Sequence, residues 1–572
     1  LKAQRLKVAI LFGPVIPPLN NAIVMGGCAC KKVSACDASS SMKGVSKVPA
    51  SVASSSTKGH ERRALSVHYM TTELMAELHS AGFTRNAKVY EIEPLLRKKG
   101  ATCKCPRDGE EGCAYVDAVN ESSAGIATAM LSYTWGYAIG DLIDALVQHC
   151  SDAELNPEST YVWMCCFCIN QHRVRAMADA GTVVPFDEFR AAFGSRVQSI
   201  GVVLALMAPW VHLVYLTRVW CIYEMATAIA LGAETCRVHI LMPPEERRRL
   251  TADLIDLTHP GSQVDARSGP ARIFDALAGT RVQEGQASVP RDRDSIMQLV
   301  AEGIGHDAVN KAVITHLTQW FASTMCSSAI EAAKVLPSPR TAQLFAAVCV
   351  FLRETGAFAE GIVFGQRILK MVRSDSVDEA VVVRAIGALF LKRAQGADLK
   401  EASRLYERAD ELFARCQPDY LTSEEYAKTC NARGALARKM GDISTAKVLF
   451  LQGKAFYDTV PDLQTPTRSV LMGNVGHVCS LQGDLAGAMA GYDAALEVRR
   501  VIDMWVNPDT ALILNSVGEL KQKQGDVAGA RAAFEEAISF REKTSTLDTP
   551  AGALVQRNLA ALAEEDVVST LA

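Results

Sequence analysis

A repeat of 42 residues in the C-terminal third is the feature that most restricts how this chain can fold. The pair glycine–aspartate recurs three times at that interval. An alanine follows five residues after each glycine, and an aromatic residue follows four residues after each alanine. The glycines are Gly441, Gly483 and Gly525, the alanines Ala446, Ala488 and Ala530, and the aromatic residues Phe450, Tyr492 and Phe534. A degenerate copy holds Gly396, Ala402, Tyr406 and Ala409, and a weaker one begins near Gly356.

This spacing predicts stacked helix pairs. A glycine can end the first helix of a pair in a left-handed turn. The small alanine lets the second helix pack closely, and the aromatic ring fills the groove against the next repeat. Because one pair cannot bury its apolar face alone, several pairs must stack. We therefore expect an all-α solenoid over residues 336–572.

The repeats resemble tetratricopeptide repeats, in the spacing found in kinesin light chains. The segments Asn515–Glu519 and Phe534–Ala537 carry the likeness best. The resemblance implies a surface that binds proteins or peptides. A kinesin-light-chain-like adaptor is one alternative, although no sustained apolar heptad precedes residue 340.

Residues 125–245 alternate between apolar strands and helices. Expected strands are Ala129–Tyr133, Tyr161–Ile169, Ile200–Met207 and Val238–Met242, and expected helices are Ala138–Cys150 and Trp220–Leu231. Nearly continuous apolar strands separated by helices predict a parallel sheet that is covered on both faces. Ligands of such α/β sheets gather at the carboxyl ends of the strands. Those ends are Ser132–Gly136, Asn170–His172 and Pro209-Trp210.

Three segments in this region resemble a TIR (Toll/interleukin-receptor) domain. They are Leu131–Trp135, Tyr161–Trp163 and Arg218–Glu224. Leu131–Gly136 and Trp163–Gln171 are also similar to the fungal heterokaryon-incompatibility domain, a TIR relative. The resemblance implies a flavodoxin-like α/β domain that precedes the solenoid.

Many TIR domains hydrolyse NAD, and the resemblance implies that Glu224 would be the catalytic carboxylate. NAD would then be a substrate, and no resident cofactor is expected. One carboxylate near the ribose can stabilise the oxocarbenium-like state that forms as nicotinamide leaves. The residues expected to contact NAD are Ser132, Thr134, Trp135, Trp163 and Trp220. Self-association would complete such sites in the family, so a homo-oligomer is expected through this domain.

A structural explanation of the same residues stays open. The helix dipole favours a glutamate in the first turn, and Arg218 could pair with Glu224. Trp220 could be a core residue. The TIR pattern usually has an acidic residue at the end of its second strand, where this chain has Cys165 and Cys166. The alternative function is a non-enzymatic scaffold that binds peptides through its repeats.

The cysteine content indicates the cellular compartment, and the net charge limits the classes of binding partner. The chain has 17 cysteines, an odd number, and Cys165, Cys166 and Cys168 lie almost adjacent in an apolar run, where disulfides would be awkward. We therefore expect reduced thiols and a cytoplasmic protein. Cys103, Cys105 and Cys113 lack a nearby fourth ligand, so no metal site is expected. A net charge of −3 predicts no nucleic-acid partner.

The sequence divides into four expected segments. Residues 1–76 are a mobile or partly ordered arm, for which organelle targeting stays open, and residues 77–261 form the TIR-like domain. Residues 262–335 are a linker with a short helix around Ala271–Ala278 and a helical bridge, and the solenoid follows. The uncharged run Ser199–Leu216 contains Pro209-Trp210, which predicts a strand and a loop rather than a membrane span.

Overall fold

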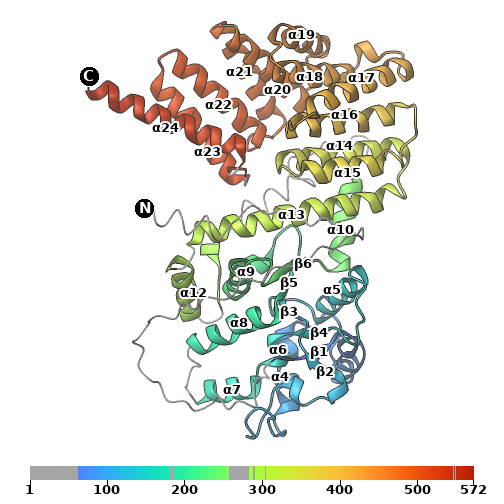
Figure 1. Ribbon diagram of the computed structural model, residues 1–572, viewed down its shortest axis with the longest axis vertical. Coiled ribbons are helices and arrows are strands. Elements are labelled where there is room, and N and C mark those ends of the chain that lie inside the picture. Colours follow the sequence, from blue (N-terminus) through green and yellow to red (C-terminus); the bar gives the residue numbers. More distant parts are fainter. Residues whose placement is uncertain are drawn as a thin grey trace, which may run out of the picture.

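The computed structural model describes residues 62–180, 186–256, 282–287, 290–302, 305–544, 546–547 and 549–571. An α/β unit forms one end of the molecule, and an array of helix pairs forms the other (Figure 1). This arrangement confirms the predicted fold class, an α/β domain followed by an all-α solenoid. Residues 1–61 of the expected arm and the expected helix at Ala271–Ala278 lie outside the described residues.

The α/β unit is built on a six-stranded sheet with the order β2-β1-β4-β3-β5-β6. The strands are β1 (Arg63–Ser66), β2 (Ala124–Ile126), β3 (Ala129–Ser132), β4 (Tyr161–Trp163), β5 (Val202–Leu206) and β6 (Arg237–Leu241). β3 pairs in parallel with β4 and β5, and β5 pairs in parallel with β6. β1 pairs antiparallel with both β2 and β4. Each of the four predicted strands is therefore present, and the four lie in one parallel set.

Helices cover both faces of this sheet. They are α2 (Val67–Tyr69), α3 (Met75–Ser80), α4 (Val89–Gly100), α5 (Ile139–Asp152), α6 (Cys165–Cys168), α7 (Gln171–Asp179), α8 (Phe186–Ile200), α9 (Val219–Leu231) and α10 (Pro244–Asp256). Figure 1 shows α5 on one side of the sheet and α8 and α9 on the other. The run Ser199–Leu216 contributes β5 and a following turn region. Among the described residues, no helix combines the length and the apolarity that crossing a bilayer requires.

Two boundaries differ from the sequence expectation. The α/β unit includes β1, in which Ala64 and Leu65 are fully buried, so it begins well before residue 77. A four-residue strand that starts at an arginine shows too little periodicity to be recognised. The strand expected over Tyr161–Ile169 ends at Trp163, because Cys165–Cys168 turns into the short helix α6.

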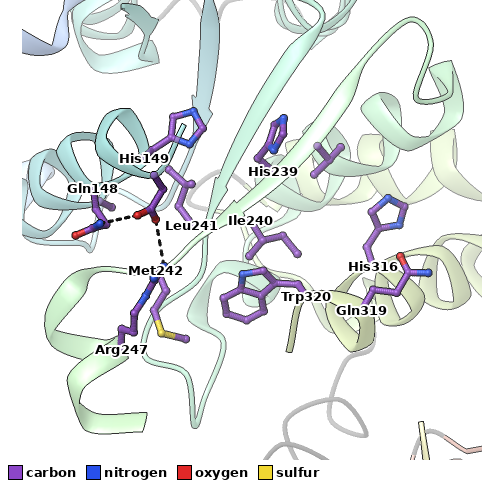
Figure 2. Close-up of a pocket in the computed structure, with 13 residues that line it drawn as sticks. Gln148, His149, His239, Ile240, Leu241, Met242, Arg247, His316, Gln319 and Trp320 are labelled. Carbon is purple, nitrogen blue, oxygen red and sulfur yellow. Dashed lines mark hydrogen bonds and ion pairs between the residues drawn. The ribbon is translucent and has the colours of Figure 1, made fainter. Parts of the chain in front are cut away.

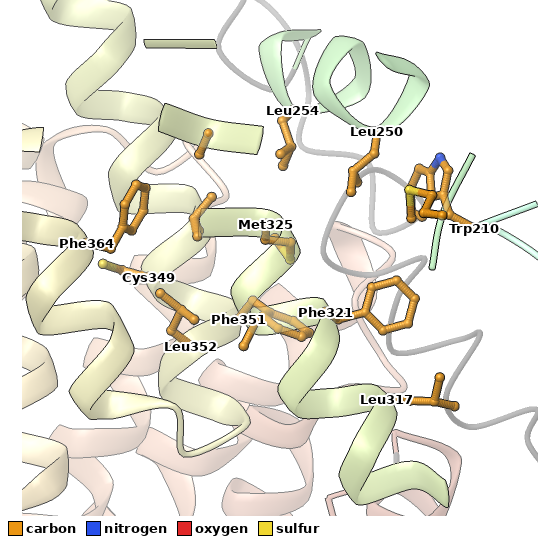
Figure 3. Close-up of a cluster of buried hydrophobic side chains, with 14 of the residues drawn as sticks. Trp210, Leu250, Leu254, Leu317, Phe321, Met325, Cys349, Phe351, Leu352 and Phe364 are labelled. Carbon is orange, nitrogen blue, oxygen red and sulfur yellow. The ribbon is translucent and has the colours of Figure 1, made fainter. Parts of the chain in front are cut away.

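A long helix joins the two parts of the molecule. α12 (Pro290–Glu302) and α13 (His306–Ala333) follow the α/β unit, and α13 runs between the sheet and the solenoid (Figure 1). One continuous hydrophobic cluster contains Trp210, Leu250, Phe321, Met325 and Phe351 (Figure 3). Because these residues belong to the α/β unit, to α13 and to the first repeat helices, the junction has a shared core.

The solenoid consists of antiparallel helix pairs. Its helices are α14 (Ser338–Glu354), α15 (Phe358–Ile368), α16 (Val377–Arg393), α17 (Asp398–Cys416), α18 (Glu424–Lys439), α19 (Ile443–Thr459), α20 (Pro466–Leu481), α21 (Leu485–Val501), α22 (Pro508–Lys523), α23 (Val527–Lys543) and α24 (Pro550–Leu571). Gly441, Gly483 and Gly525 have φ values of 77–88°, which confirms the predicted left-handed turns. The aspartate after each glycine accepts a backbone hydrogen bond and caps the second helix.

The aromatic position of the repeat packs against a second glycine series. Gly434, Gly476 and Gly518 also recur every 42 residues, in the first helix of each pair. A Cβ at Gly518 would come within 2.4 Å of the Phe534 ring, and one at Gly434 within 2.6 Å of the Phe450 ring. These rings are fully buried. The glycines therefore let the two helices of a pair approach closely enough to enclose the ring.

Candidate functional site

Glu224 lies on α9 beneath the end of β3. Its side chain is buried, with 6% of the residue exposed, and Ser132 Oγ donates a hydrogen bond to Glu224 Oε2. Ser132 Oγ also lies 2.6 Å from the hydroxyl of Tyr215, which donates to the carbonyl of Cys221 at 3.0 Å. The fold thus brings the predicted Ser132 and Glu224 together, within a buried hydrogen-bonded chain.

Burial governs the ionisation of Glu224. It raises the pKa of the Glu224 carboxyl to about 8, and the hydrogen bond from Ser132 offsets only part of that effect. At neutral pH the side chain is therefore mostly protonated. Stabilisation of an oxocarbenium-like state needs an ionised carboxylate that a ligand can reach. In the described geometry Glu224 is buried and protonated, so it is not an ionised carboxylate that a ligand can reach.

Two of the three predicted tryptophans, Trp163 and Trp220, belong to an aromatic cluster on the face covered by α8 and α9. Phe193 of α8 lies between them, with ring centroids 5.8 Å from Trp163 and 5.3 Å from Trp220. Trp163 is buried, and the Trp220 indole N–H donates to Asp292 Oδ2 at 3.4 Å. Tyr223 meets Trp220 edge-on. This packing resembles a core more closely than the wall of a nucleotide site.

Thr134 and Trp135 lie on the loop after β3, apart from this cluster. Thr134 is buried, and its Oγ1 accepts a hydrogen bond from the backbone of Gly136 at 3.3 Å. The Trp135 indole N–H points to Cys165 Sγ at 3.3 Å. Both side chains therefore stabilise the loop and its contact with α6.

Sequence reasoning missed three residues of this region, Tyr215, Cys221 and Phe193. Tyr215 and Cys221 complete the hydrogen-bonded chain with Ser132, and Phe193 joins the two tryptophans. Tyr215 lies at the end of an apolar run, and no local pattern singled it out. Only the pairing of β3 with β5 and the path of α9 bring these positions together.

The described residues contain no group of three or more histidine, cysteine, aspartate or glutamate side chains that could hold a metal ion. Cys103, Cys105 and Cys113 are free thiols there. Burial raises the pKa of the Cys113 thiol to about 12, with Cys103 close by. Such a thiol stays protonated at neutral pH.

The solenoid presents a second candidate site along its first helices. α18, α20 and α22 contact one another in succession, so together they form one continuous surface. Arg438, His477 and Lys523 come from these three helices. Burial, together with the nearby charges of Arg438 and Lys523, lowers the pKa of His477 to about 4. Within the described residues, the buried Nε of Arg438 has no hydrogen-bond partner.

Asparagine pairs connect α18 to α20 and α22 to α24. Asn474 Nδ2 donates to Asn431 Oδ1 at 2.8 Å, and Asn558 Nδ2 donates to Asn515 Oδ1 at 2.9 Å. Glu519 accepts from both Asn515 and Asn558. An asparagine amide offers two donors and a two-fold acceptor, so each side chain retains bonding capacity. The first-helix face, defined here by Arg438, His477, Lys523 and the asparagines, therefore combines amide and cationic groups with one carboxylate, Glu519.

Comparison with known proteins finds no matching family profile and no matching curated protein. Several solved structures are similar. BtubC (BKLC) from P. vanneervenii has 16% identity and a TM-score of 0.31, over 40% of this chain and 91% of its own. A putative kinesin light chain of Podosopora anserina with nearly identical TPR-like repeats has 13% identity and a TM-score of 0.28, over 37% of this chain and 99% of its own. A tetratricopeptide repeat protein from Parabacteroides merdae has 12% identity and a TM-score of 0.29, over 55% of this chain and 99% of its own.

Proposed function

We propose that this protein is a scaffold whose repeat solenoid binds an extended acidic peptide on its first-helix face. The observation that carries the proposal is the position of Arg438, His477 and Lys523 on three successive first helices. Arg438 and Lys523 lie close enough to His477 to lower its pKa, so two cations flank a neutral histidine on this face. A peptide carboxylate would compensate the charges of Arg438 and Lys523.

The asparagines support the same ligand. Side-chain amides pair well with peptide backbone groups, because each supplies both a donor and an acceptor. The amides of Asn431, Asn474 and Asn558, which are half-buried, would hold an extended chain, while the cations select its charge. The unsatisfied Nε of Arg438 provides a donor for a carboxylate.

Fluorescence anisotropy tests this function with a labelled peptide of about ten residues in which glutamate alternates with serine. The 572-residue chain should bind it, and a version with glutamine in place of glutamate should bind far more weakly. Arg438→Gln should weaken binding about tenfold, as loss of a charge-assisted hydrogen bond does. Lys439→Gln is the matched control, because Lys439 is the next residue on α18 and is exposed. Equal losses in the two variants would argue against a site at Arg438.

Hydrolysis of NAD is a finer function that rests on the TIR resemblance alone. The burial and protonation of Glu224 do not favour it in the described conformation. It stays a prediction, as do self-association through the α/β unit and a cytoplasmic location. Release of nicotinamide by concentrated protein, with loss in Glu224→Gln, would establish the activity, and turnover that Glu224→Gln leaves unchanged would exclude Glu224 as its catalyst.

A further inference from the structure

A cavity of about 360 Å³ lies along the free edge of the sheet, at β6 (Figure 2). His149 and Asp152 of α5 line one wall, and His316 and Trp320 of α13 line the other. Arg247 of α10 lies at one end of the cavity. The cavity is on the α/β unit, so it is separate from the first-helix face of the solenoid.

The register of β6 shows which backbone groups face this cavity. The N–H of Arg237 bonds to the carbonyl of Gly201, and the N–H of Met207 bonds to the carbonyl of Leu241. Residues 237, 239 and 241 therefore direct their backbone groups to β5. The N–H and C=O groups of Val238 and Ile240 then point away from β5, toward the open edge. These are the groups that an additional strand would engage.

The surroundings provide cover for such a strand on both faces. The His239 ring lies 5.9 Å from His149 of α5, whereas Ile240 packs against the cluster that contains Phe321 of α13. Alternate residues of β6 thus face α5 and α13. An added strand beside β6 would place its alternate side chains against the same two helices.

Arg247 supplies a charge for recognition. Its Nε is buried and has no hydrogen-bond partner among the described residues. Its Nη2 forms a loose ion pair with Asp152 Oδ2 at 3.7 Å, and Gln148 donates to the other Asp152 oxygen at 2.7 Å (Figure 2). Burial lowers the pKa of both His149 and His239, so these rings are neutral at pH 7 and Arg247 is the cation at this end.

We propose that the edge of β6 binds an extended peptide as an additional strand, with a carboxylate side chain of the peptide on Arg247. Backbone hydrogen bonds to Val238 and Ile240 would supply affinity, and Arg247 would supply charge selectivity. This site is additional to the peptide surface of the solenoid and does not depend on it.

The probe is a capped hexapeptide in which valine alternates with glutamate, added to the 572-residue chain. Hydrogen exchange followed by mass spectrometry reports on residues 237–241 directly, so binding to the solenoid does not affect the readout. Exchange at the N–H groups of Val238 and Ile240 should slow at least several-fold on addition of the peptide. A version of the peptide with N-methyl groups on alternate backbone nitrogens should have no effect.

Two variants distinguish the contribution of the β6 backbone hydrogen bonds from that of the Arg247 charge. Val238→Pro removes an N–H that faces the cavity and leaves the bonds to β5 intact, a position that an edge strand tolerates. It should abolish protection of the remaining β6 amides. Arg247→Gln should weaken binding about tenfold. Arg248→Gln is its matched control, because Arg248 is exposed and pairs with Glu245 at 2.6 Å.

Three results would overturn the proposal. One is unchanged exchange over residues 237–241 at saturating peptide. Another is equal protection by the N-methylated peptide. The third is slow exchange at Val238 and Ile240 before any peptide is added, which would mean that another segment of the chain or a second copy already covers the edge. If Val238→Pro fails to fold, the comparison of Arg247→Gln with Arg248→Gln still decides the role of the charge.

Discussion

At the scale of single residues, burial decides what Glu224 can do. Its carboxyl shares a hydrogen bond with Ser132 and has no described cation as a partner in that chain of contacts. A buried acid without a compensating charge retains its proton. Folding therefore takes up a proton at this position as the pH rises above the ordinary carboxyl range.

This uptake gives the protein a specific pH dependence. The folded-state pKa of about 8 is higher than the unfolded value of 4.5, so the stability contributed by Glu224 is complete below pH 4.5 and is lost as the pH rises to 8. Glu224→Gln keeps the shape and cannot ionise, so it should be the more stable protein at pH 8.5, by up to about 3–5 kcal/mol. Urea unfolding at pH 5 and pH 8.5 measures the difference. Identical pH profiles for the two proteins would show that Glu224 is not a protonated buried acid.

At the scale of elements, the repeat explains most of what the sequence predicted correctly. The periodic glycine, alanine and aromatic residues of a repeat belong to a single helix pair. Their spacing along the sequence is therefore enough to predict that pair. The four parallel strands were also recognisable, because each is an apolar run between helices. β1 and β2 were not, since they are short and pair with partners far away in the sequence. The surroundings of Glu224 also depend on contacts between distant residues, such as Ser132 on β3, so its burial could not be predicted.

Two glycines on α20 provide a test of the packing within a repeat. A Cβ at Gly476 would lie 2.8 Å from the carbonyl of Ala488 and 3.0 Å from the Tyr492 ring, whereas the nearest atom at Gly473 is 3.5 Å away. Gly476→Ala should therefore destabilise the protein by about 1–3 kcal/mol. Gly473→Ala should be neutral or stabilising by up to about 1 kcal/mol, because alanine favours the helix. Thermal unfolding of both variants measures the difference. Equal melting temperatures would show that Gly476 is not needed for close packing of the helix pair.

At the scale of the whole molecule, three large hydrophobic cores divide the chain differently from its two folds, and one of them, which contains β1, β3, β4 and α5, lies within the α/β unit. One core runs from β5 and α9 through α13 to the first repeats, and another belongs to the repeats from α18 onward. A shared core couples the stability of the elements that build it. The α/β unit and the proximal repeats should therefore unfold together, while the distal repeats open separately.

Phe321→Ala and Phe534→Ala test this division, since both rings are fully buried, Phe321 in the core that α13 shares with the first repeats and Phe534 in the core of the distal repeats. Each variant should lose about 3–5 kcal/mol of local stability. In Phe321→Ala, hydrogen exchange should accelerate in β5 and α14 together and stay unchanged in α22 and α23. Phe534→Ala should show the reverse pattern. Faster exchange throughout the chain in either variant would indicate a single cooperative unit.

Peptide binding by the solenoid is the central functional claim, and its location can be measured directly. Hydrogen exchange of the 572-residue chain with and without the alternating glutamate–serine peptide should show slower exchange in α18, α20 and α22. The second helices α19, α21 and α23 should not change, because the cations lie on α18, α20 and α22 and the asparagines on these helices and on α24. Protection confined to the second helices, or no protection at any peptide concentration, would contradict a binding surface on the first-helix face.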